Sequence, residues 1–317
     1  MHIYSKKNLL ALLILLSMSS CEKETNVDIS KNPAKLVVLG EFNQEDDALI
    51  NLSTSVFSTA KGAFPDVEDA QISLLDKNNT LIEKYTYQSK GNYTGKKAMT
   101  GQQYKLAVNY NGETYQAQTT IPSAFNLNLI EQDASSLIAE IVDLSLEINA
   151  YTFEILAKPF TVDRYYLENG QKIKVNSEAE FTELLKIKPN LEPKRDTTFN
   201  TKFSRIYIET ADNRTENVKY NVLKDNSGRI FLTDKTFNGG KTTLEIYYQN
   251  LLSNTANIQY VLVVKSTDPV YFNYLYSSDL QAAKSLAGIT DVPIKGNIVN
   301  ALGIWGGAYV KKIILKN

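Results

Sequence analysis

The sequence predicts a mainly β protein, in which an N-terminal immunoglobulin-like β-sandwich is followed by a second β-rich domain with one or two short helices. Short segments rich in Tyr, Thr, Val and Ile alternate between apolar and polar residues, which is typical of half-buried strands. Asn- and Gly-containing dipeptides that favour tight turns separate several of these segments. The chain has 317 residues, enough for two domains with cores of their own.

Residues 1–20 are expected to be a secretory signal peptide. A cationic start ending at Lys7 precedes the apolar run 9–16, which is too short for the roughly 20 residues that cross a bilayer. Ser19 and Ser20 then precede Cys21, the only cysteine of the chain. This arrangement resembles a bacterial lipoprotein processing site, at which Cys21 is lipidated and becomes the first mature residue. An ordinary signal peptide with a chance cysteine is the alternative.

Residues 21–34 are expected to form a flexible tether behind the lipidated cysteine. Glu22, Lys23 and Glu24 resemble the acidic signal that exports Bacteroidota lipoproteins to the outer face of the outer membrane. A charged, solvated tether on the periplasmic face is the alternative. The expected location is therefore the outer membrane, with the folded part facing the cell exterior.

Composition excludes several classes of chemistry. The single histidine, His2, leaves with the signal peptide, and Cys21 carries the lipid, so the mature chain has no imidazole and no thiol. Catalysis by Ser-His-Asp or Cys-His groups and zinc sites built on His or Cys are thereby excluded. Lys and Arg number 34 against 35 acidic residues, so no basic excess suggests a nucleic-acid partner. We expect no cofactor, no metal and no enzymatic activity.

The first domain is expected at residues 35–123, with about seven strands, the number typical of an immunoglobulin-like sandwich. Asn78-Asn79 and Asn111-Gly112 predict hairpin turns, because these residues tolerate positive φ. Pro122 is expected to end the domain, since proline removes a hydrogen-bond donor from a strand. The predicted strands are 35–42, 48–53, 70–75, 81–87, 91–93, 104–110 and 114–119.

The second domain is expected at residues 124–317. The segment 135–146 fits a helix or a strand, 190–200 is expected to be an exposed loop, and the Gly- and Asn-rich segment 293–307 is expected to be another loop. Ser177 and Glu180 form a capping box for one short helix, and Asp268-Pro269 begins a second helix. The predicted strands are 125–130, 151–160, 164–167, 172–174, 205–209, 218–223, 229–232, 242–248, 258–265 and 309–315.

Eight short fragments occur in order along the chain: 35–42, 69–74, 91–93, 101–106, 120–122, 232–239, 271–275 and 296–305. Together they resemble an uncharacterised family of Bacteroidota outer-membrane lipoproteins over nearly the whole mature chain. The family usually has Phe at the position of Trp305. The resemblance implies a cell-surface lipoprotein with an immunoglobulin-like first domain, associated with a TonB-dependent outer-membrane transporter, and it implies no catalytic residues.

Aromatic residues near the C-terminus are the candidate contacts to a partner or ligand. Trp305 lies between glycines, Tyr309 begins the last predicted strand, and Tyr274 belongs to the aromatic-rich segment 271–276 of the second predicted helix. Aromatic faces of this kind stack on sugars or pack against partners. Packing in the core is the alternative, and it is favoured both for the helical segment and for Trp305, which would then close the second domain.

Two loops offer weaker candidates. The acidic residues 45–47 supply oxygen ligands of the kind that Ca²⁺ prefers, but they lack EF-hand spacing, so a solvated turn is favoured. The segment 235–240 is a candidate ligand loop, although a turn requiring positive φ at glycine is favoured.

Three functions remain open from the sequence. The leading hypothesis is a non-catalytic accessory or binding subunit of a TonB-dependent transporter complex, which predicts an exposed apolar patch with aromatics at one end of the second domain. A structural or adhesive surface protein predicts neither a cleft nor a large patch. A glycosidase predicts two carboxylates in a cleft, roughly 5–10 Å apart.

Overall fold

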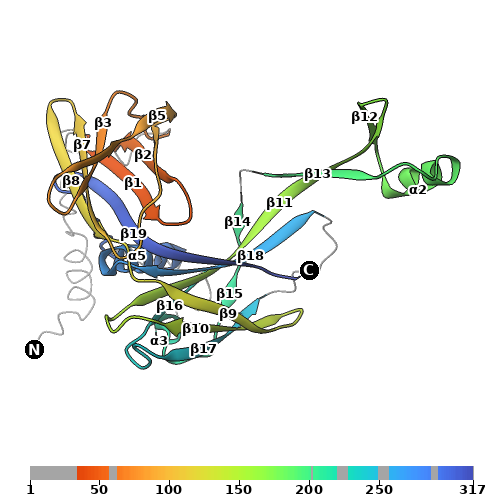
Figure 1. Cartoon of the computed structure of the whole chain (residues 1–317). Helices are drawn as coiled ribbons and strands as arrows, with labels where there is room; N and C mark the ends of the chain where they lie inside the picture. Colours follow the sequence, from red (N-terminus) through yellow and green to blue (C-terminus); the bar gives the residue numbers. More distant parts are fainter. Residues whose placement is uncertain are drawn as a thin grey trace, which may run out of the picture.

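The computed structural model describes residues 34–56, 63–200, 203–219, 228–248, 257–286 and 292–316. The chain folds into three sheets and is mainly β, which confirms the predicted fold class (Figure 1). The first strands form an immunoglobulin-like β-sandwich, and the later strands and helix α5 form a layered C-terminal region. The signal peptide, Cys21 and the predicted export signal lie outside the described residues.

The sandwich pairs two antiparallel layers. One layer has the order β4-β3-β7-β8, and the other has the order β1-β2-β6-β5. The chain changes layers at the buried Tyr85, so the segment predicted as one strand at 81–87 is two strands. The strands are β1 (Leu36–Asn43), β2 (Ala48–Thr54), β3 (Gln71–Asp76), β4 (Leu81–Lys84), β5 (Thr86–Ser89), β6 (Asn92–Gly95), β7 (Gln103–Tyr110) and β8 (Glu113–Thr120).

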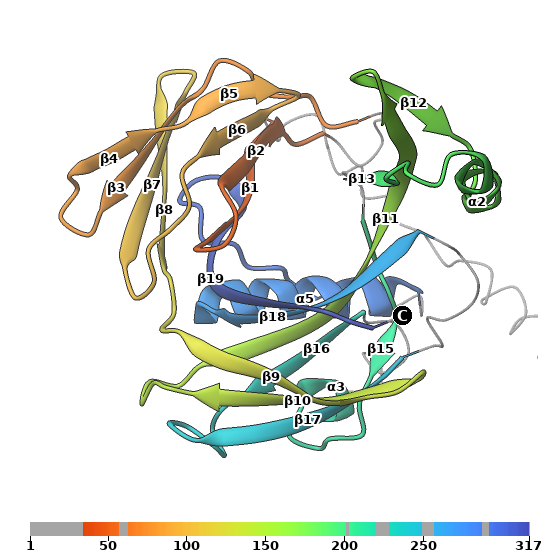
Figure 2. The same cartoon turned by 45° about the vertical axis from the view of Figure 1, so that its right-hand side comes forward.

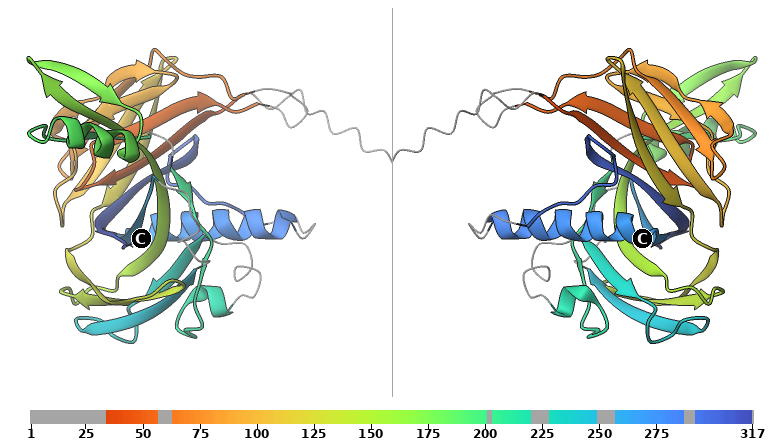
Figure 3. Two further views of the ribbon diagram at one scale, coloured as in Figure 1. Left: turned by 90° about the vertical axis from the view of Figure 1, so that its right-hand side faces the viewer. Right: turned by 90° about the vertical axis from the view of Figure 1, so that its left-hand side faces the viewer.

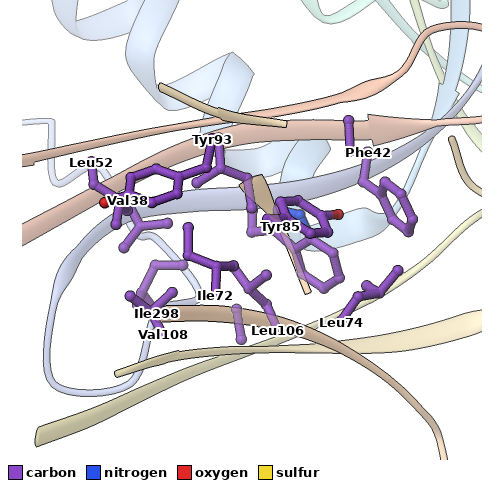
Figure 4. Close-up of a cluster of buried hydrophobic side chains, with 14 of the residues drawn as sticks. Val38, Phe42, Leu52, Ile72, Leu74, Tyr85, Tyr93, Leu106, Val108 and Ile298 are labelled. Atoms are coloured by element: carbon purple, nitrogen blue, oxygen red, sulfur yellow. The ribbon is translucent and has the colours of Figure 1, made fainter. Parts of the chain in front are cut away.

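The sandwich core forms because alternate residues of each strand face inward. Ile72, Leu106 and Val108 from one layer meet Val38 and Tyr93 from the other (Figure 4). The hairpin turns follow the sequence prediction: Asn79, Asn111 and Gly112 have positive φ values of 67°, 50° and 77°.

The last strand, β19 (Leu302–Ile314), belongs to both halves of the molecule. Its first part pairs in parallel with β1, from Val37↔Leu302 to Asn43↔Ala308. Its second part pairs antiparallel with β18 (Ile258–Thr267), from Thr267↔Ala308 to Val261↔Ile314. The sandwich layer therefore continues into the C-terminal region as one sheet, and the C-terminal segment completes the first predicted domain.

The C-terminal region has three layers, and this sheet lies between a helix and a second, lower sheet. Strand β11 (Ala150–Glu168) pairs with β18, and side chains alternate between two cores: Tyr151, Phe153 and Ile155 face one layer, whereas Leu156 faces α5 (Pro269–Leu286). In Figure 3, α5 crosses the central strands and extends to one side of them, and in Figure 2, β9, β10 and β17 lie below them. The lower sheet has the order β15-β17-β10-β9, formed by β9 (Phe125–Gln132), β10 (Ser136–Asp143), β15 (Ile208–Glu209) and β17 (Lys241–Tyr248).

An arm projects from the body where β11 continues beyond the core (Figure 1). Its end pairs with β12 (Gln171–Val175) and β13 (Lys194–Phe199), and α2 (Glu178–Ile187) covers a small core around Phe181. Ser177 caps α2 as predicted, accepting a hydrogen bond from the backbone of Glu180 at 3.1 Å. Two short strands, β14 (Ser204–Arg205) and β16 (Arg229–Thr233), pair with β11. The short helix α3 (Glu216–Lys219) lies beside β16.

Three local predictions need correction, and one open alternative is settled. The ambiguous segment at 135–146 contains strand β10, and the loop expected at 190–200 contains strand β13, whose residues are all exposed and are held by pairing with β11. The strand expected at 218–223 has a helical turn, α3, over its described residues. The loop expected at 293–307 contains the start of β19, because its glycines lie against neighbouring atoms: a Cβ on Gly306 would lie 2.1 Å from the Tyr271 ring.

Candidate functional site

An exposed apolar loop lies at one end of the C-terminal region, between β10 and β11 (Figure 2). Leu144, Leu146 and Ile148 are 61%, 87% and 64% exposed. Three large apolar side chains at this exposure within five consecutive residues form a patch of the kind that marks interaction sites on soluble proteins. We call these three residues the apolar loop.

The backbone of the apolar loop is fixed by hydrogen bonds from outside it. Asp143 accepts hydrogen bonds from the backbone of Ser145 at 3.0 Å and of Gly239 at 3.1 Å. The Asn238 side chain donates to the carbonyl of Leu146 at 3.0 Å. The turn between β16 and β17 therefore supports the loop, so its apolar side chains are held outward on an ordered backbone.

A pocket of about 310 Å³ adjoins the apolar loop. Ile148 forms part of its wall, and Pro269, Phe272 and Tyr276 of α5 supply most of the remaining apolar lining. Lys235 and Glu216 lie at its edge and give it charges of both signs. The apolar loop and this pocket together form an aromatic-containing apolar surface, which we call the apolar end.

A second hollow, the junction cleft, lies where the sandwich meets the C-terminal region, and it has a volume of about 430 Å³. Volumes of this order are typical of sites for small molecules. Its apolar lining comes from Leu49, Leu156, Phe203, Val263 and Val310. Its charged lining comes from Glu41, Asp46, Asp47, Glu154, Lys158, Lys265 and Lys312.

Glu41 connects the two halves beside this cleft. Its carboxylate accepts hydrogen bonds from the Lys265 ammonium and from the Tyr271 hydroxyl, both at 2.6 Å. Burial alone would raise the pKa of Glu41, but the Lys265 charge and these hydrogen bonds outweigh burial and lower it. Burial raises the pKa of Tyr271, and the adjacent Glu41 charge raises it further.

Glu154 is the centre of a second buried ion pair. Arg229 donates to Glu154 at 2.6 Å and to Asp279 at 3.0 Å, while Arg205 approaches the other oxygen of Glu154 at 3.3 Å. Burial opposes ionisation of Glu154, but Arg229, Lys265 and Arg205 together lower its pKa to about 2. Both cleft glutamates are thus ionised at neutral pH and are bound to cations, an arrangement suited to structure and recognition.

Two of the three aromatic residues singled out from the sequence, Trp305 and Tyr309, are buried. Trp305 is fully buried in the sandwich core, where its ring stacks on Phe42 with centroids 5.3 Å apart. Tyr309 is buried against Phe125, and Tyr274 is half-buried beside the α5 core. The burial favoured for Trp305 is confirmed, and a fully buried ring cannot serve as the candidate contact. The domain was wrong, because Trp305 completes the first domain rather than the second.

The two weaker candidate loops are turns. Residues 45–47 connect β1 with β2, and Asp46 binds Lys312 at 2.8 Å. Residues 235–240 connect β16 with β17, with φ of 66° at Gly239. Among the described residues there is no group of three or more acidic, His or Cys side chains that could hold a metal ion. Within the same ranges, no helix is long and apolar enough to cross a membrane.

Sequence reasoning missed the apolar loop and the Glu154–Arg229 pair. The apolar loop falls at the end of a segment that fits either helix or strand, and its apolar residues gave no sign that they face solvent. Glu154 and Arg229 are 75 positions apart, so only the pairing of β11 with β16 brings them together.

Comparisons with known proteins give no family. No family model and no curated protein matches the chain. Among solved structures, a DUF4785 family protein from Legionella pneumophila aligns at 10% identity and a TM-score of 0.22, over 73% of this chain and 51% of that protein. The FN1–FN3 domains of chicken CNTN1 align at 12% identity and a TM-score of 0.19, over 74% and 62%. The S. aureus collagen adhesin aligns at 9% and 0.19, over 89% and 93%. At these TM-scores the likenesses carry no argument about function.

Proposed function

We propose that this protein is a lipoprotein anchored through Cys21 at the outer face of the outer membrane, and that it acts as a non-catalytic binding subunit of a TonB-dependent transporter complex. The apolar end would contact the outer-membrane barrel. The continuous sheet beside the junction cleft would keep the sandwich and the C-terminal region in a fixed relative position. The N-terminal signals and the family resemblance described above support the location and the partner.

The observation that carries this proposal is the exposure of the apolar loop beside an aromatic-lined pocket. Leu144, Leu146 and Ile148 would lose the unfavourable hydration of their side chains on binding an apolar surface. This is the patch that a partner-binding subunit requires at one end of its second domain.

The charges of the junction cleft also support binding rather than hydrolysis. A glycosidase requires one carboxyl group with a raised pKa, which serves as the acid. Glu41 and Glu154 both have lowered pKa values and are already paired with cations, so neither is suited to donate a proton at neutral pH.

A pull-down of the tagged full chain from solubilised outer membranes tests the proposal. We expect the wild type to recover a TonB-dependent barrel. Changing Leu144, Leu146 and Ile148 together to Ser should weaken binding by about tenfold or more, because the loss of three apolar contacts needs to total only about 1.4 kcal/mol for a tenfold change. The stability of the chain should change little, since these side chains are exposed.

The matched control changes two exposed apolar residues on the sandwich, Leu81 and Ile82, which are 51% and 50% exposed. This variant should recover as much barrel as the wild type. Recovery of the bait alone by the wild type would contradict the transporter proposal and favour a structural or adhesive surface protein. Equal recovery by the apolar-loop variant would contradict the assignment of the apolar end.

A further inference from the structure

Two buried carboxyl groups meet at the base of the apolar loop. Asp143 is the last residue of β10 and is 3% exposed, and Asp234 follows β16 and is fully buried. Asn149 touches both of them: its backbone N–H donates to Asp234 Oδ2 at 2.7 Å, and its side-chain amide donates to Asp143 Oδ1 at 3.4 Å. The two carboxyl groups therefore close the loop that runs from Asp143 to Asn149.

The hydrogen-bond donors around the pair are unequally divided. Asp143 accepts from the backbone of Ser145 and Gly239 as well as from Asn149, so both of its oxygens have donors. Asp234 Oδ2 has the Asn149 donor, but Asp234 Oδ1 is buried with no donor among the described residues. A charge on that oxygen would be uncompensated and adjacent to a second carboxylate, which is unfavourable in a buried site.

We infer that Asp234 carries a proton that it donates to Asp143, and that this one-proton carboxyl pair is a latch that holds the apolar loop closed. The bond would run from Asp234 Oδ1–H to a carboxylate oxygen of Asp143, giving the orphaned oxygen a partner. Loss of the proton would place two carboxylates against each other at the point where β10, the loop and the turn after β16 meet. This inference goes beyond the proposed function and does not depend on it.

The groups that face the carboxyl pair supply no positive charge that would stabilise a second carboxylate. From β11, Tyr151 faces it, and burial, followed by the charge of Asp143 and a hydrogen bond with it, raises the pKa of this phenol, so it stays neutral and supplies no positive charge. From β18, the neutral Ser266 lies against Asn149 at 3.5 Å. Lys235 is exposed, and neither carboxyl group takes part in an ion pair within the described part of the chain. Burial, and secondarily the hydrogen bond and charge of Asp143, raise the pKa of Asp234, opposed by the Asn149 N–H.

The carboxyl pair differs from a catalytic dyad because it is closed to a substrate. Paired carboxyl groups with separated pKa values also occur in active sites. The side chain of Asp234 is fully buried here, so a substrate cannot reach it without opening the loop. A structural latch fits this burial.

Asp234→Asn tests the latch, because an amide can donate to Asp143 as the protonated acid does but cannot titrate. The pKa of Asp234 in the folded state is raised above its ordinary value of 3.8, so its contribution to stability is fully present below that value and is lost as pH rises through the folded-state pKa. The ratio of the wild-type to the Asp234→Asn folding constant should therefore fall with pH, by up to about tenfold per pH unit. Urea unfolding across the acid and neutral range measures this ratio.

Two further measurements make the outcome decisive. Carboxyl ¹³C NMR of the wild type should show Asp234 titrating above 3.8, and Asp143→Asn should lower that pKa. Chymotryptic cleavage after Leu146, normalised to cleavage of the free loop peptide, should rise with pH in the wild type and stay flat in Asp234→Asn. Glu131→Gln, an exposed carboxylate on β9, is the control and should behave as the wild type. An Asp234 that titrates at or below 3.8 in the wild type would overturn the inference even if the variants fail to fold, as would parallel stability curves.

Discussion

Replacing Glu154 by Gln is expected to lower the free energy of unfolding by about 3–5 kcal/mol, the usual cost of removing one partner of a buried ion pair. Glu154 is 4% exposed and contacts Arg229 at 2.6 Å and Arg205 at 3.3 Å. The neutral amide removes the shorter of the two ion pairs of the buried Arg229 given above and leaves its contact with Asp279, so much of the desolvation cost of its charge is no longer offset. Urea unfolding at neutral pH measures the change.

Glu154 should also make the free energy of unfolding fall at acid pH. The pKa of Glu154 is lowered from 4.5 to about 2 in the folded chain. Its contribution is therefore present above the unfolded value and is lost as pH falls toward 2, and the linkage amounts to about 3 kcal/mol. Glu154→Gln should remove this component from the acid limb.

The exposed pair Lys186–Glu183 on α2 provides the control. Glu183→Gln should change the free energy of unfolding by less than about 0.5 kcal/mol, since exposed ion pairs contribute little. A Glu154→Gln variant as stable as the Glu183→Gln variant would contradict the role assigned to the buried pair.

Trp305→Ala is expected to cost about 3–5 kcal/mol, because it leaves a large cavity in the sandwich core. Trp305 is fully buried and stacks on Phe42. Since β19 pairs with both β1 and β18, the sandwich and the C-terminal region should lose stability together. Because Trp305 is the only tryptophan, tyrosine fluorescence is the second probe of this variant. Tyrosine fluorescence and circular dichroism should show one shared unfolding transition, shifted to lower denaturant. Loss of the sandwich alone, with the C-terminal region still folded, would contradict the coupling through β19.

Trp305→Phe is the matched variant. The indole Nε1 of Trp305 is buried without a hydrogen-bond partner among the described residues, so the wild type already bears the cost of an unsatisfied donor. Phenylalanine removes that donor while it fills much of the volume, and we expect a change of less than about 1.5 kcal/mol. A loss of unfolding free energy equal to that of Trp305→Ala would contradict the view that Trp305 stabilises the core mainly through the volume of its ring.

Local sequence signals were sufficient for most of the strands and turns. Alternating apolar residues predicted the sandwich strands, and Asn111-Gly112 predicted a hairpin that the structure confirms with positive φ at both residues. Asp268 also begins α5 as predicted, accepting a hydrogen bond from the backbone of Val270 at 2.7 Å. These features depend on residues close together in the sequence.

Features that depend on distant residues were missed or misplaced. The segment 302–307 is rich in glycine and was expected to be a loop, yet it is a strand because β1 pairs with it and because Gly306 admits the Tyr271 ring. Likewise, β13 has no buried residue and is a strand only through its pairing with β11. Such long-range pairings leave no periodic pattern in the sequence.

The candidate sites were even harder to predict from local sequence patterns than the strands. The junction cleft combines residues from β1, β11, β18 and β19, whose register cannot be derived from local pattern. The predicted aromatic contacts failed because Trp305 and Tyr309 are inward-facing residues of a strand. The apolar loop is a surface feature, and exposure of a leucine is decided by the whole fold.

The most direct test of the account is metabolic labelling with radioactive palmitate, because the proposed location and the proposed partner both require the lipid anchor. The account predicts that the wild-type chain takes up label, sediments with outer membranes and is cleaved by protease added to intact cells. Cys21→Ser should lose the label and the membrane association. A wild-type chain that incorporates no palmitate would contradict the account.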